Sequence, residues 1–334
     1  MNPLGKPAPK LLEIGVDSAG QRLDNFLHKS LKGAPQSLVY RIIRSGEVRV
    51  NKGRAKPDTR LDFGDLVRVP PISLIAVAAK GAVAGAATAG ADFPVLFEDE
   101  SILAIDKPAG VAVHGGSGLR FGVIEALRAA RPDARFLELV HRLDRDTSGI
   151  LLLAKTRPLL VAMHELLREG RIDKRYLALA RGVWPHAAKH HITTALASFV
   201  TREGERRVLQ ADHDAAKEAH SVVNMMRRYA AATLLEVQIK TGRTHQIRVH
   251  LASAGHPIVG DDKYGDFAFN RAIAKAGCKR MFLHAAKISF VHPHSGQRVR
   301  FESPLPPECQ AYLATLPKPG TDARAEKLVA APME

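Results

Sequence analysis

The chain has 334 residues, of which 46% are hydrophobic and 25% are charged, a composition typical of a globular protein with room for more than one core. Lysine and arginine outnumber aspartate and glutamate by 49 to 34, which favours a polyanionic partner, although a solvated basic surface would give the same count. Only two cysteines and no apolar stretch typical of a signal peptide or a membrane span argue against a secreted, disulfide-rich or membrane protein, so we expect a cytoplasmic location.

Residues 20–71 form the first predicted unit, after an N-terminal extension of residues 1–19. Apolar residues recur at helical spacing in GQRLDNFLHKSL and in PQSLVYRIIRSG, which predicts two short helices, the second ending at Gly46. Apolar alternation in EVRV and LVRV, with a turn at residues 51–53, predicts a hairpin. Basic residues crowd the second helix and the turn, as phosphate contacts require. The candidates for RNA contact are Arg41, Arg44 and Lys52, with Arg49 and Arg54 beside them.

This pattern resembles the S4 RNA-binding domain, whose signature is a helix beginning RLDxxL, a second helix ending in IxxGxVxVNG, and a hairpin around GD. The present sequence has NKG where NG is usual. The resemblance implies that the unit binds RNA. The alternative is an ordinary solvated face on a small domain.

Residues 72–92, rich in alanine and glycine, predict a flexible linker that would leave two domains independently oriented. Residues 93–316 form the second predicted unit, and residues 317–334 a loose tail. Strand-like and helical runs alternate in the second unit, which predicts a mixed α+β domain. The predicted strands are 102–105, 149–154, 176–180, 234–239 and 288–291, and the predicted helices are 123–130, 158–169, 244–254 and 308–316.

A dense polar segment, residues 141–149, runs directly into an apolar strand. Polar groups at the start of a buried strand are held rigidly, as a site requires, although a solvated loop is the common fate of such a run. The segment HRLDRDTSGILLLAK matches the catalytic motif HRLDxxTSGxLLxAK of the RluA-type pseudouridine synthases. Three further motifs of that family follow its order: DKPAGVAVHGG at 106–116, KRYLALARG at 174–182 and TGRTHQIRVHLASAGHPIVGDDKYG at 241–265.

The resemblance covers most of residues 93–316. It implies the α+β pseudouridine synthase fold, a mixed, largely antiparallel sheet with flanking helices and a central cleft, behind a small S4 (α-L) domain. It implies an enzyme that isomerises uridines of 23S rRNA, free or in a pre-50S ribosomal particle, and we expect a monomer with no membrane partner. Because the reaction exchanges an N1–C1′ bond for a C5–C1′ bond without net oxidation, no small-molecule cofactor is expected.

By this resemblance Asp144 is the catalytic nucleophile, Arg243 its cationic partner and Tyr176 the active-site tyrosine. A carboxylate could attack C1′ of the ribose or add to C6 of the uracil, and the sequence does not choose. A guanidinium would keep the carboxylate ionised in a closed site, but Arg243 could also be a phosphate contact or an exposed residue at a helix start. Tyr176 would stack on the extruded base or help to move the C5 proton, or it could be a core residue.

Further residues of these motifs are expected to contact RNA or to support the cleft, each with a structural alternative. They are Lys107, His114, His141, Arg142, Thr147 and Lys155. The GGSG at 115–118 lacks the pattern of a nucleotide-binding loop and predicts a turn that lines the RNA cleft. The histidines His186, His190 and His191 lack a metal-ligand spacing, and no metal is expected.

Two rival functions stay open at this stage. Asp146 lies two residues from Asp144, and a pair of carboxylates could serve an N-glycosidase as acid and base. A non-catalytic RNA-binding or ribosome-assembly factor could keep the fold without the reaction, but it would be expected to lose Asp144 or Arg243, and both are present.

Overall fold

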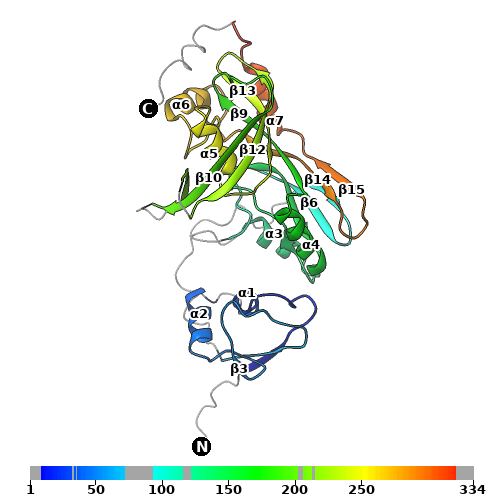
Figure 1. The fold of residues 1–334 in the computed structure, drawn as a ribbon. Coiled ribbons are helices and arrows are strands. Elements are labelled where there is room, and N and C mark those ends of the chain that lie inside the picture. Colours follow the sequence, from blue (N-terminus) through cyan, green and yellow to red (C-terminus); the bar gives the residue numbers. More distant parts are fainter. Residues whose placement is uncertain are drawn as a thin grey trace, which may run out of the picture. The chain divides into compact units, whose positions relative to one another are not determined.

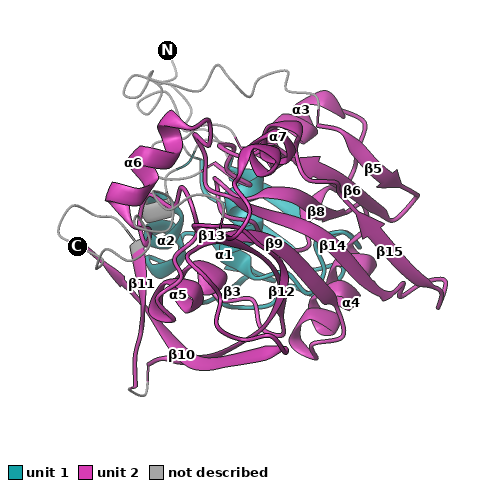
Figure 2. Ribbon diagram, turned by 90° about the horizontal axis from the view of Figure 1, so that it is seen from above, with its two compact units in different colours: residues 1–84 teal, residues 85–334 magenta. Residues whose placement is uncertain are grey.

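The computed structural model describes residues 9–31, 34, 36–71, 93–115, 122–201, 206–212 and 215–320. The chain divides into two compact units, residues 1–84 and residues 85–334, coloured separately in Figure 2. The predicted linker at 72–92 and the predicted tail from residue 321 onward lie outside the described residues. No helix within the described ranges is both long and apolar enough to cross a membrane.

The first unit is a four-stranded antiparallel sheet with two helices. The strand order is β1 (Lys10–Glu13), β4 (Leu66–Val69), β2 (Arg49–Val50) and β3 (Gly53–Arg54). The two predicted helices are confirmed as α1 (Leu23–Ser30) and α2 (Gln36–Arg44), and Leu27 and Ile42 are buried in the core of this unit. Strand β1 and the buried Ile14 lie in the segment predicted to be an extension, so this unit begins before residue 20.

The turn between β2 and β3 explains the unusual NKG sequence. Its two residues, Asn51 and Lys52, both have positive φ, 48° and 68°. Glycine normally takes the second position of such a turn, because a β-carbon costs roughly 1–2 kcal/mol in the left-handed region. The side chain of Asn51 secures the turn through a 2.7 Å hydrogen bond to Asp65 and a 2.9 Å bond from the backbone of Leu66.

The second unit is built on a large mixed sheet, which Figure 1 shows with its helices. Eleven strands are recorded among the described residues, and all their pairings are antiparallel except that of β8 with β14. Nine strands follow the order β11 (Arg206–Gln210), β10 (His190–Val200), β12 (Lys217–Arg228), β13 (Ala232–Ile239), β9 (Asp173–Arg181), β14 (Leu283–Val291), β8 (Ser148–Ala154), β6 (Ile102–Lys107) and β5 (Val95–Glu98), while β15 (Arg298–Glu302) pairs with β14 and β7 (Glu138–Leu139) with β8. The predicted sheet is confirmed.

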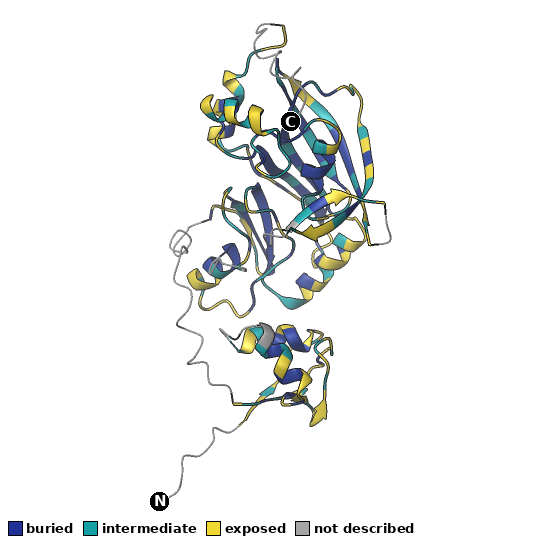
Figure 3. Ribbon diagram, turned by 90° about the vertical axis from the view of Figure 1, so that its left-hand side faces the viewer, coloured by how far each residue is buried: buried dark blue, intermediate teal, exposed yellow. Residues whose placement is uncertain are grey.

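Strand β8 is buried on both of its faces. Leu151 and Leu153 belong to one core together with helix α3 (Val123–Ala130), and Leu152 belongs to a second core together with helix α4 (Arg157–Arg168). Because neighbouring side chains of a strand point to opposite faces, a strand between two helices needs a continuous apolar run. Figure 3 shows dark blue concentrated in the central strands of this sheet, with exposed residues in yellow on the outer faces of the helices.

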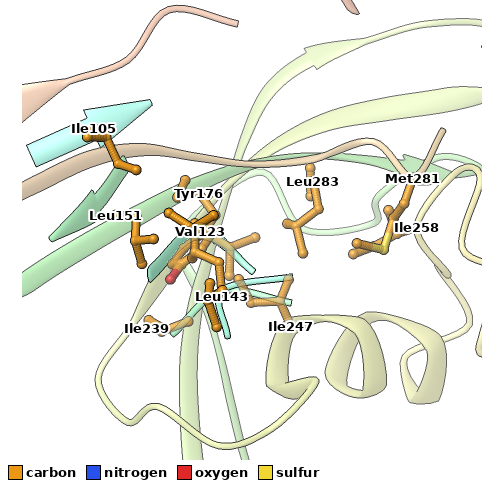
Figure 4. Close-up of a cluster of buried hydrophobic side chains, with 14 of the residues drawn as sticks. Ile105, Val123, Leu143, Leu151, Tyr176, Ile239, Ile247, Ile258, Met281 and Leu283 are labelled. Atoms are coloured by element: carbon orange, nitrogen blue, oxygen red, sulfur yellow. The ribbon is translucent and has the colours of Figure 1, made fainter. Parts of the chain in front are cut away.

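Three further helices complete the second unit: α5 (Gln246–Ser253), α6 (Phe267–Lys275) and α7 (Pro307–Thr315). Helix α5 packs Ile247 and Leu251 into the same core as α3. Figure 4 shows Ile247 in this core near Leu143 and Tyr176, which come from the segment before β8 and from β9. These three residues therefore join three of the four parts of the chain that carry the family motifs in one core.

One glycine fixes the spacing of two central strands. Gly149, at the start of β8, has φ of 108° and pairs with Ala285 of β14. A β-carbon at Gly149 would lie 2.3 Å from the carbonyl oxygen of Ala285, so only glycine allows the strands to approach this closely.

Candidate active site

A cavity of about 520 Å³ lies beside the polar segment that precedes β8. Four parts of the second unit line most of it: that polar segment, the end of α4, strand β9 and the connection from β13 to α5. The lining includes Asp144, Thr147, Lys174, Tyr176, Arg243 and Arg248. The structure thus brings together residues that are about a hundred positions apart in the sequence.

Asp144 faces an arginine in this cavity, and that arginine is Arg248. Its Nη1 lies 3.5 Å from Oδ2 of Asp144, whose side chain keeps 19% of its surface exposed. The ring of His245 is slightly farther away, with Nε2 at 3.9 Å from the same oxygen. A fixed guanidinium beside a carboxylate offsets part of the cost of burying the negative charge.

The guanidinium of Arg248 is held by a second carboxylate, Asp261. Nε and Nη2 of Arg248 each donate a 2.7 Å hydrogen bond to Asp261, and both side chains are almost fully buried. Burial alone would lower the pKa of Arg248, but the bonds to Asp261 outweigh it and raise that pKa above its ordinary value. The two-pronged bond leaves Nη1 pointing to Asp144.

The structure places Arg248, rather than the predicted Arg243, beside the carboxylate of Asp144. Arg243 lines the same cavity, but its Nε donates a 2.9 Å hydrogen bond to the backbone carbonyl of Glu218. Arg243 precedes α5, whereas Arg248 lies within it, and the first turn of this helix carries Arg248 toward Asp144. The sequence alone does not indicate which of the two arginines faces the carboxylate.

Buried polar contacts brace the connection between β13 and α5. Oε1 of Gln246 accepts hydrogen bonds from the hydroxyl of Thr241 and the backbone of Arg243, while its Nε2 donates to the carbonyl of His220 and the hydroxyl of Ser221. His245 caps the helix with φ of 54°, and its Nδ1 lies 2.8 Å from the hydroxyl of Tyr264. These contacts fix the start of the helix that carries Arg248.

Tyr176 is both a core residue and a residue of the cavity wall. It belongs to the buried core and also lines the cavity. Burial, together with the nearby charge of Asp144, raises the pKa of its phenol well above the ordinary value. The phenol is therefore protonated at neutral pH, and the ring offers an aromatic surface in the cavity.

The remaining predicted residues of the catalytic segment fall into two groups. Arg142, which is exposed, and Thr147, which is buried, line the cavity. His141 lines it as well, but its Nε2 accepts a hydrogen bond from the backbone of Leu152, and burial lowers its pKa to about 4. His141 is thus a neutral ring tied to β8.

Three predicted RNA contacts lie elsewhere in the second unit. Lys107 is fully buried, and its Nζ donates to the carbonyls of Pro108, Val111 and Arg145, so it is a structural residue. Lys155, at the other end of β8, forms an ion pair of 2.8 Å with Glu98 and is not among the residues that line the cavity. His114 is exposed, also outside the lining, beside residues 116–121 that are not described; the predicted GGSG turn falls mostly there.

Asp146 does not share the cavity of Asp144. It lines a second cavity, of about 780 Å³, together with Lys107, Ser148 and Arg280, and it pairs with the neighbouring Arg145. The two carboxylates therefore open into different cavities, which removes the geometric basis for an acid and base pair. Among the described residues, no three histidine, cysteine, aspartate or glutamate side chains lie together in a group that could hold a metal ion.

The basic candidates of the first unit are exposed. Arg41 and Arg44 lie on α2, with the guanidinium of Arg44 5.7 Å from the centre of the Tyr40 ring, and Lys52 lies at the tip of the β2–β3 turn. Exposed cations on one helix and an adjacent turn can contact phosphates.

Sequence reasoning missed three residues of the site: Arg248, Asp261 and Lys174. Arg248 lies between Ile247 and Val249 in a helix whose residues 246–251 are all buried. A buried arginine requires a carboxylate partner, and the pair Asp261–Asp262 soon follows it in the chain. The sequence does not indicate that Lys174 belongs to the site, because the alternation of side chains along β9 does not show which end of the strand lines a cavity.

Comparison with known proteins agrees with this geometry. A family model described as RNA pseudouridylate synthase matches residues 101–253, and a model of the S4 domain matches residues 21–67. The "Ribosomal large subunit pseudouridine synthase C" of Pasteurella multocida is 50% identical over 92% of this chain and 94% of its own length. The protein of the same name from Escherichia coli K12 is 51% identical over 90% of this chain and 94% of its own length.

Among solved structures, "Human RNA Pseudouridylate Synthase Domain Containing 4" superimposes with a TM-score of 0.55 at 23% identity, covering 68% of this chain and 95% of that one. This likeness shows the fold. The sequence relatives, at half identity over nearly their whole length, show the family. The chain belongs to the RluA-type RNA pseudouridylate synthase family and carries an S4 domain at its N-terminal end.

Proposed function

We propose that this protein converts specific uridines of 23S rRNA to pseudouridine, with Asp144 as the nucleophile. The observation that carries the proposal is the arrangement of Asp144, which opens into the cavity 3.5 Å from an arginine held in place by Asp261. The names of the half-identical relatives refer to the large ribosomal subunit, and this supports rRNA as the substrate.

The reaction requires a uridine to leave the RNA stack. Extruding a base costs a few kcal/mol, and an aromatic surface in the receiving pocket recovers part of that cost. The ring of Tyr176 lines a cavity of about 520 Å³, within the range of small-ligand sites. We therefore propose Tyr176 as the surface against which the uracil lies.

Asp144 can then react by either of two routes. Its carboxylate attacks C1′, and the electrons of the N1–C1′ bond pass into the uracil, or it adds to C6, and the ring electrons pass to a carbonyl oxygen. In both routes the N1–C1′ bond breaks and the uracil turns. C5 then forms a bond to C1′, the carboxylate leaves the carbon that it attacked, the C5 proton is lost and N1 gains a proton. Arg248 holds the Asp144 carboxylate in place before the attack and faces it again once it has left the substrate.

The first unit would hold the RNA through phosphates rather than through bases. Arg41, Arg44 and Lys52 are exposed, as electrostatic contacts with a backbone require. We propose that the protein acts in the cytoplasm on free 23S rRNA or on a pre-50S particle. A side-by-side assay of both substrates would distinguish them.

Release of tritium tests the proposed reaction. Purified protein is incubated, with EDTA present, with unmodified 23S rRNA labelled with tritium at C5 of uridine. We expect release by the wild type and by Asp146→Asn, because Asp146 opens into the other cavity, and none by Asp144→Asn. Loss of activity in both variants would support a two-carboxylate mechanism. Tight RNA binding without release by the wild type would favour an assembly factor.

A further inference from the structure

Lys174 is a buried lysine in the cavity of Asp144 that no step of the proposed reaction uses. It lies near the start of β9, two residues before Tyr176, so both side chains point to the same face of the strand. Its surface is only 9% exposed, and it lines the same cavity as Tyr176 and Asp144. The lysine is thus a deep part of the cavity wall rather than a residue of its rim.

The ammonium of Lys174 lacks a protein partner in the part of the chain that the structure describes: no hydrogen bond or ion pair of its Nζ is recorded there. Lys107, the other deeply buried lysine of this unit, donates to three carbonyls. Arg248 binds Asp261 through two hydrogen bonds. A buried cation is normally paired, so an unpaired one that faces a cavity indicates an acceptor supplied by a ligand.

The surroundings of Lys174 leave room for such an acceptor. A β-carbon at Gly242 would lie 3.6 Å from Nζ of Lys174, so the missing side chain leaves this side of the ammonium uncovered. The charged or titratable groups that line the cavity from the other elements are Asp144, His141, Arg142, Arg168, Lys240, Arg243, His245 and Arg248, with Tyr176 on the same strand. Most of them are cationic or neutral, and the single carboxylate, Asp144, faces Arg248.

Burial lowers the pKa of Lys174 to about 8. The ammonium is therefore still largely protonated at neutral pH and can donate hydrogen bonds there. It would lose its proton within the range in which an enzyme assay can be run.

We propose that Lys174 donates a hydrogen bond to a carbonyl oxygen of the extruded uracil and stabilises the negative charge that the base acquires during the reaction. This inference rests on the proposed function. In attack at C1′, the electrons of the N1–C1′ bond become delocalised onto the carbonyl oxygens of the departing uracil. When the carboxylate adds to C6 instead, the electrons of the C5–C6 double bond reach the same oxygens as an enolate. Lys174 keeps its proton in both routes, and the negative charge returns to Asp144 when the carboxylate leaves the carbon that it attacked.

A carbonyl oxygen fits this position better than a phosphate does. Lys174 shares a face of β9 with the ring that we propose lies against the base, and it is deeply buried. A backbone phosphate is strongly hydrated and would be expected at the exposed cations that line the cavity, Arg142 and Lys240. The test must therefore distinguish phosphate binding by Lys174, which would change the Kd for rRNA, from binding of the carbonyl oxygen, which would change the rate constant.

Single-turnover kinetics at saturating rRNA measure the proposed role. Lys174→Met is expected to lower the rate constant of tritium release by about 100- to 1,000-fold, as loss of one donor to a developing anion does elsewhere, while the Kd for rRNA stays the same. Lys174→Gln, which keeps a neutral donor, should retain an intermediate rate. Lys287→Met makes the same change on the neighbouring strand β14, away from the cavity, and should match the wild type.

The pH profile separates this role from a structural one. Deprotonation of Lys174 should lower the wild-type rate constant above pH 8 or so, and this decline should be absent in Lys174→Met. Far-UV circular dichroism and urea unfolding establish that each variant is folded.

Three outcomes would overturn the inference. A weaker Kd with an unchanged rate constant in Lys174→Met would assign the lysine to a phosphate. A rate constant and pH profile equal to the wild type would deny it any part in the reaction. No release by the wild type would remove the proposed function, and this role of Lys174 with it, whereas release at equal rates by the wild type and Lys174→Met would leave the function standing without this role.

Discussion

Two cavities lie beside the polar segment that precedes β8, and their charged groups differ in how they are satisfied. In the larger cavity, Lys107 donates to three carbonyls, and Arg280 donates to Ser148 and pairs with Glu308. In the smaller cavity, the closest distance between Asp144 and Arg248 is 3.5 Å, from Oδ2 to Nη1, which is longer than the 2.7 Å bonds from Arg248 to Asp261. Lys174 has no hydrogen-bond or ion-pair partner among the described residues. The smaller cavity is therefore distinguished by charged groups without close protein partners, and not by its size. A bound substrate could supply hydrogen-bond partners to these groups.

The arginines of the smaller cavity give the largest expected effect. Arg248→Lys should lower the single-turnover rate constant by about 100-fold or more, because an ammonium cannot bind Asp261 through two hydrogen bonds and also face Asp144. Arg243→Lys is the matched change, and the rate constant should fall by less than about tenfold. A larger loss in Arg243→Lys than in Arg248→Lys would return the role of carboxylate partner to Arg243.

The two buried lysines should have opposite effects on stability. Lys107→Met leaves three buried carbonyls without their donor, so the free energy of unfolding should fall by about 3 kcal/mol or more. Lys174→Met removes a buried charge that lacks a recorded partner, so the free energy of unfolding at pH 7 should rise by up to about 3 kcal/mol. Urea unfolding of both variants measures these changes.

The stability difference at Lys174 also has a definite pH dependence. The pKa of this lysine is about 8 in the folded protein against 10.5 in the unfolded chain, so the unfolded state binds more protons between these values. Wild-type stability therefore gains from this group as pH rises through that window, because a buried charge is being neutralised. The advantage of Lys174→Met should be greatest below pH 8 and vanish near pH 10.5. A constant advantage would mean that the pKa of Lys174 is the same in the folded and the unfolded protein, as it would be if the ammonium were paired.

The smallest effect is expected from the larger cavity. Ser148→Ala removes a buried hydroxyl that receives a 2.6 Å hydrogen bond from Arg280 and lies 2.9 Å from Nδ1 of His284. The free energy of unfolding should fall by about 1–2 kcal/mol, and the rate constant of tritium release should not change. A loss of rate without a loss of stability would give the larger cavity a part in the reaction.

The sequence predicted the elements that carry strong periodicity. Helix α3 has the predicted bounds, and the apolar runs of β6 and β8 are strands because both of their faces are covered. Strands β10 to β12 and helix α6 were not predicted. Residues 190–200 mix histidine, threonine and alanine on a partly exposed strand, and such a sequence lacks the contrast between apolar and polar positions on which prediction depends.

The sequence predicted the site residues that lie within recognisable motifs. It missed those whose position depends on partners far away in the sequence. Asp144 and Tyr176 lie in motifs that can be recognised along the chain, and both line the cavity. The choice between Arg243 and Arg248 depends on Asp261 and Glu218, which reach the arginines only through the fold. Lys107 and Lys155 look alike in sequence as cations near the motif, but Lys107 is bonded to backbone carbonyls, Lys155 is paired with Glu98, and neither lines the cavity of Asp144.

The close approach of β8 and β14 at Gly149 limits which substitutions this enzyme family can accept. The segment with Asp144 enters the sheet on β8, Tyr176 lies on β9, and β14 lies between the two strands. Any side chain at Gly149 would push β14 aside and change the gap between nucleophile and base. We therefore expect glycine at this position in every active relative, and a lineage that replaces it to have given up the reaction while remaining free to keep the RNA-binding unit.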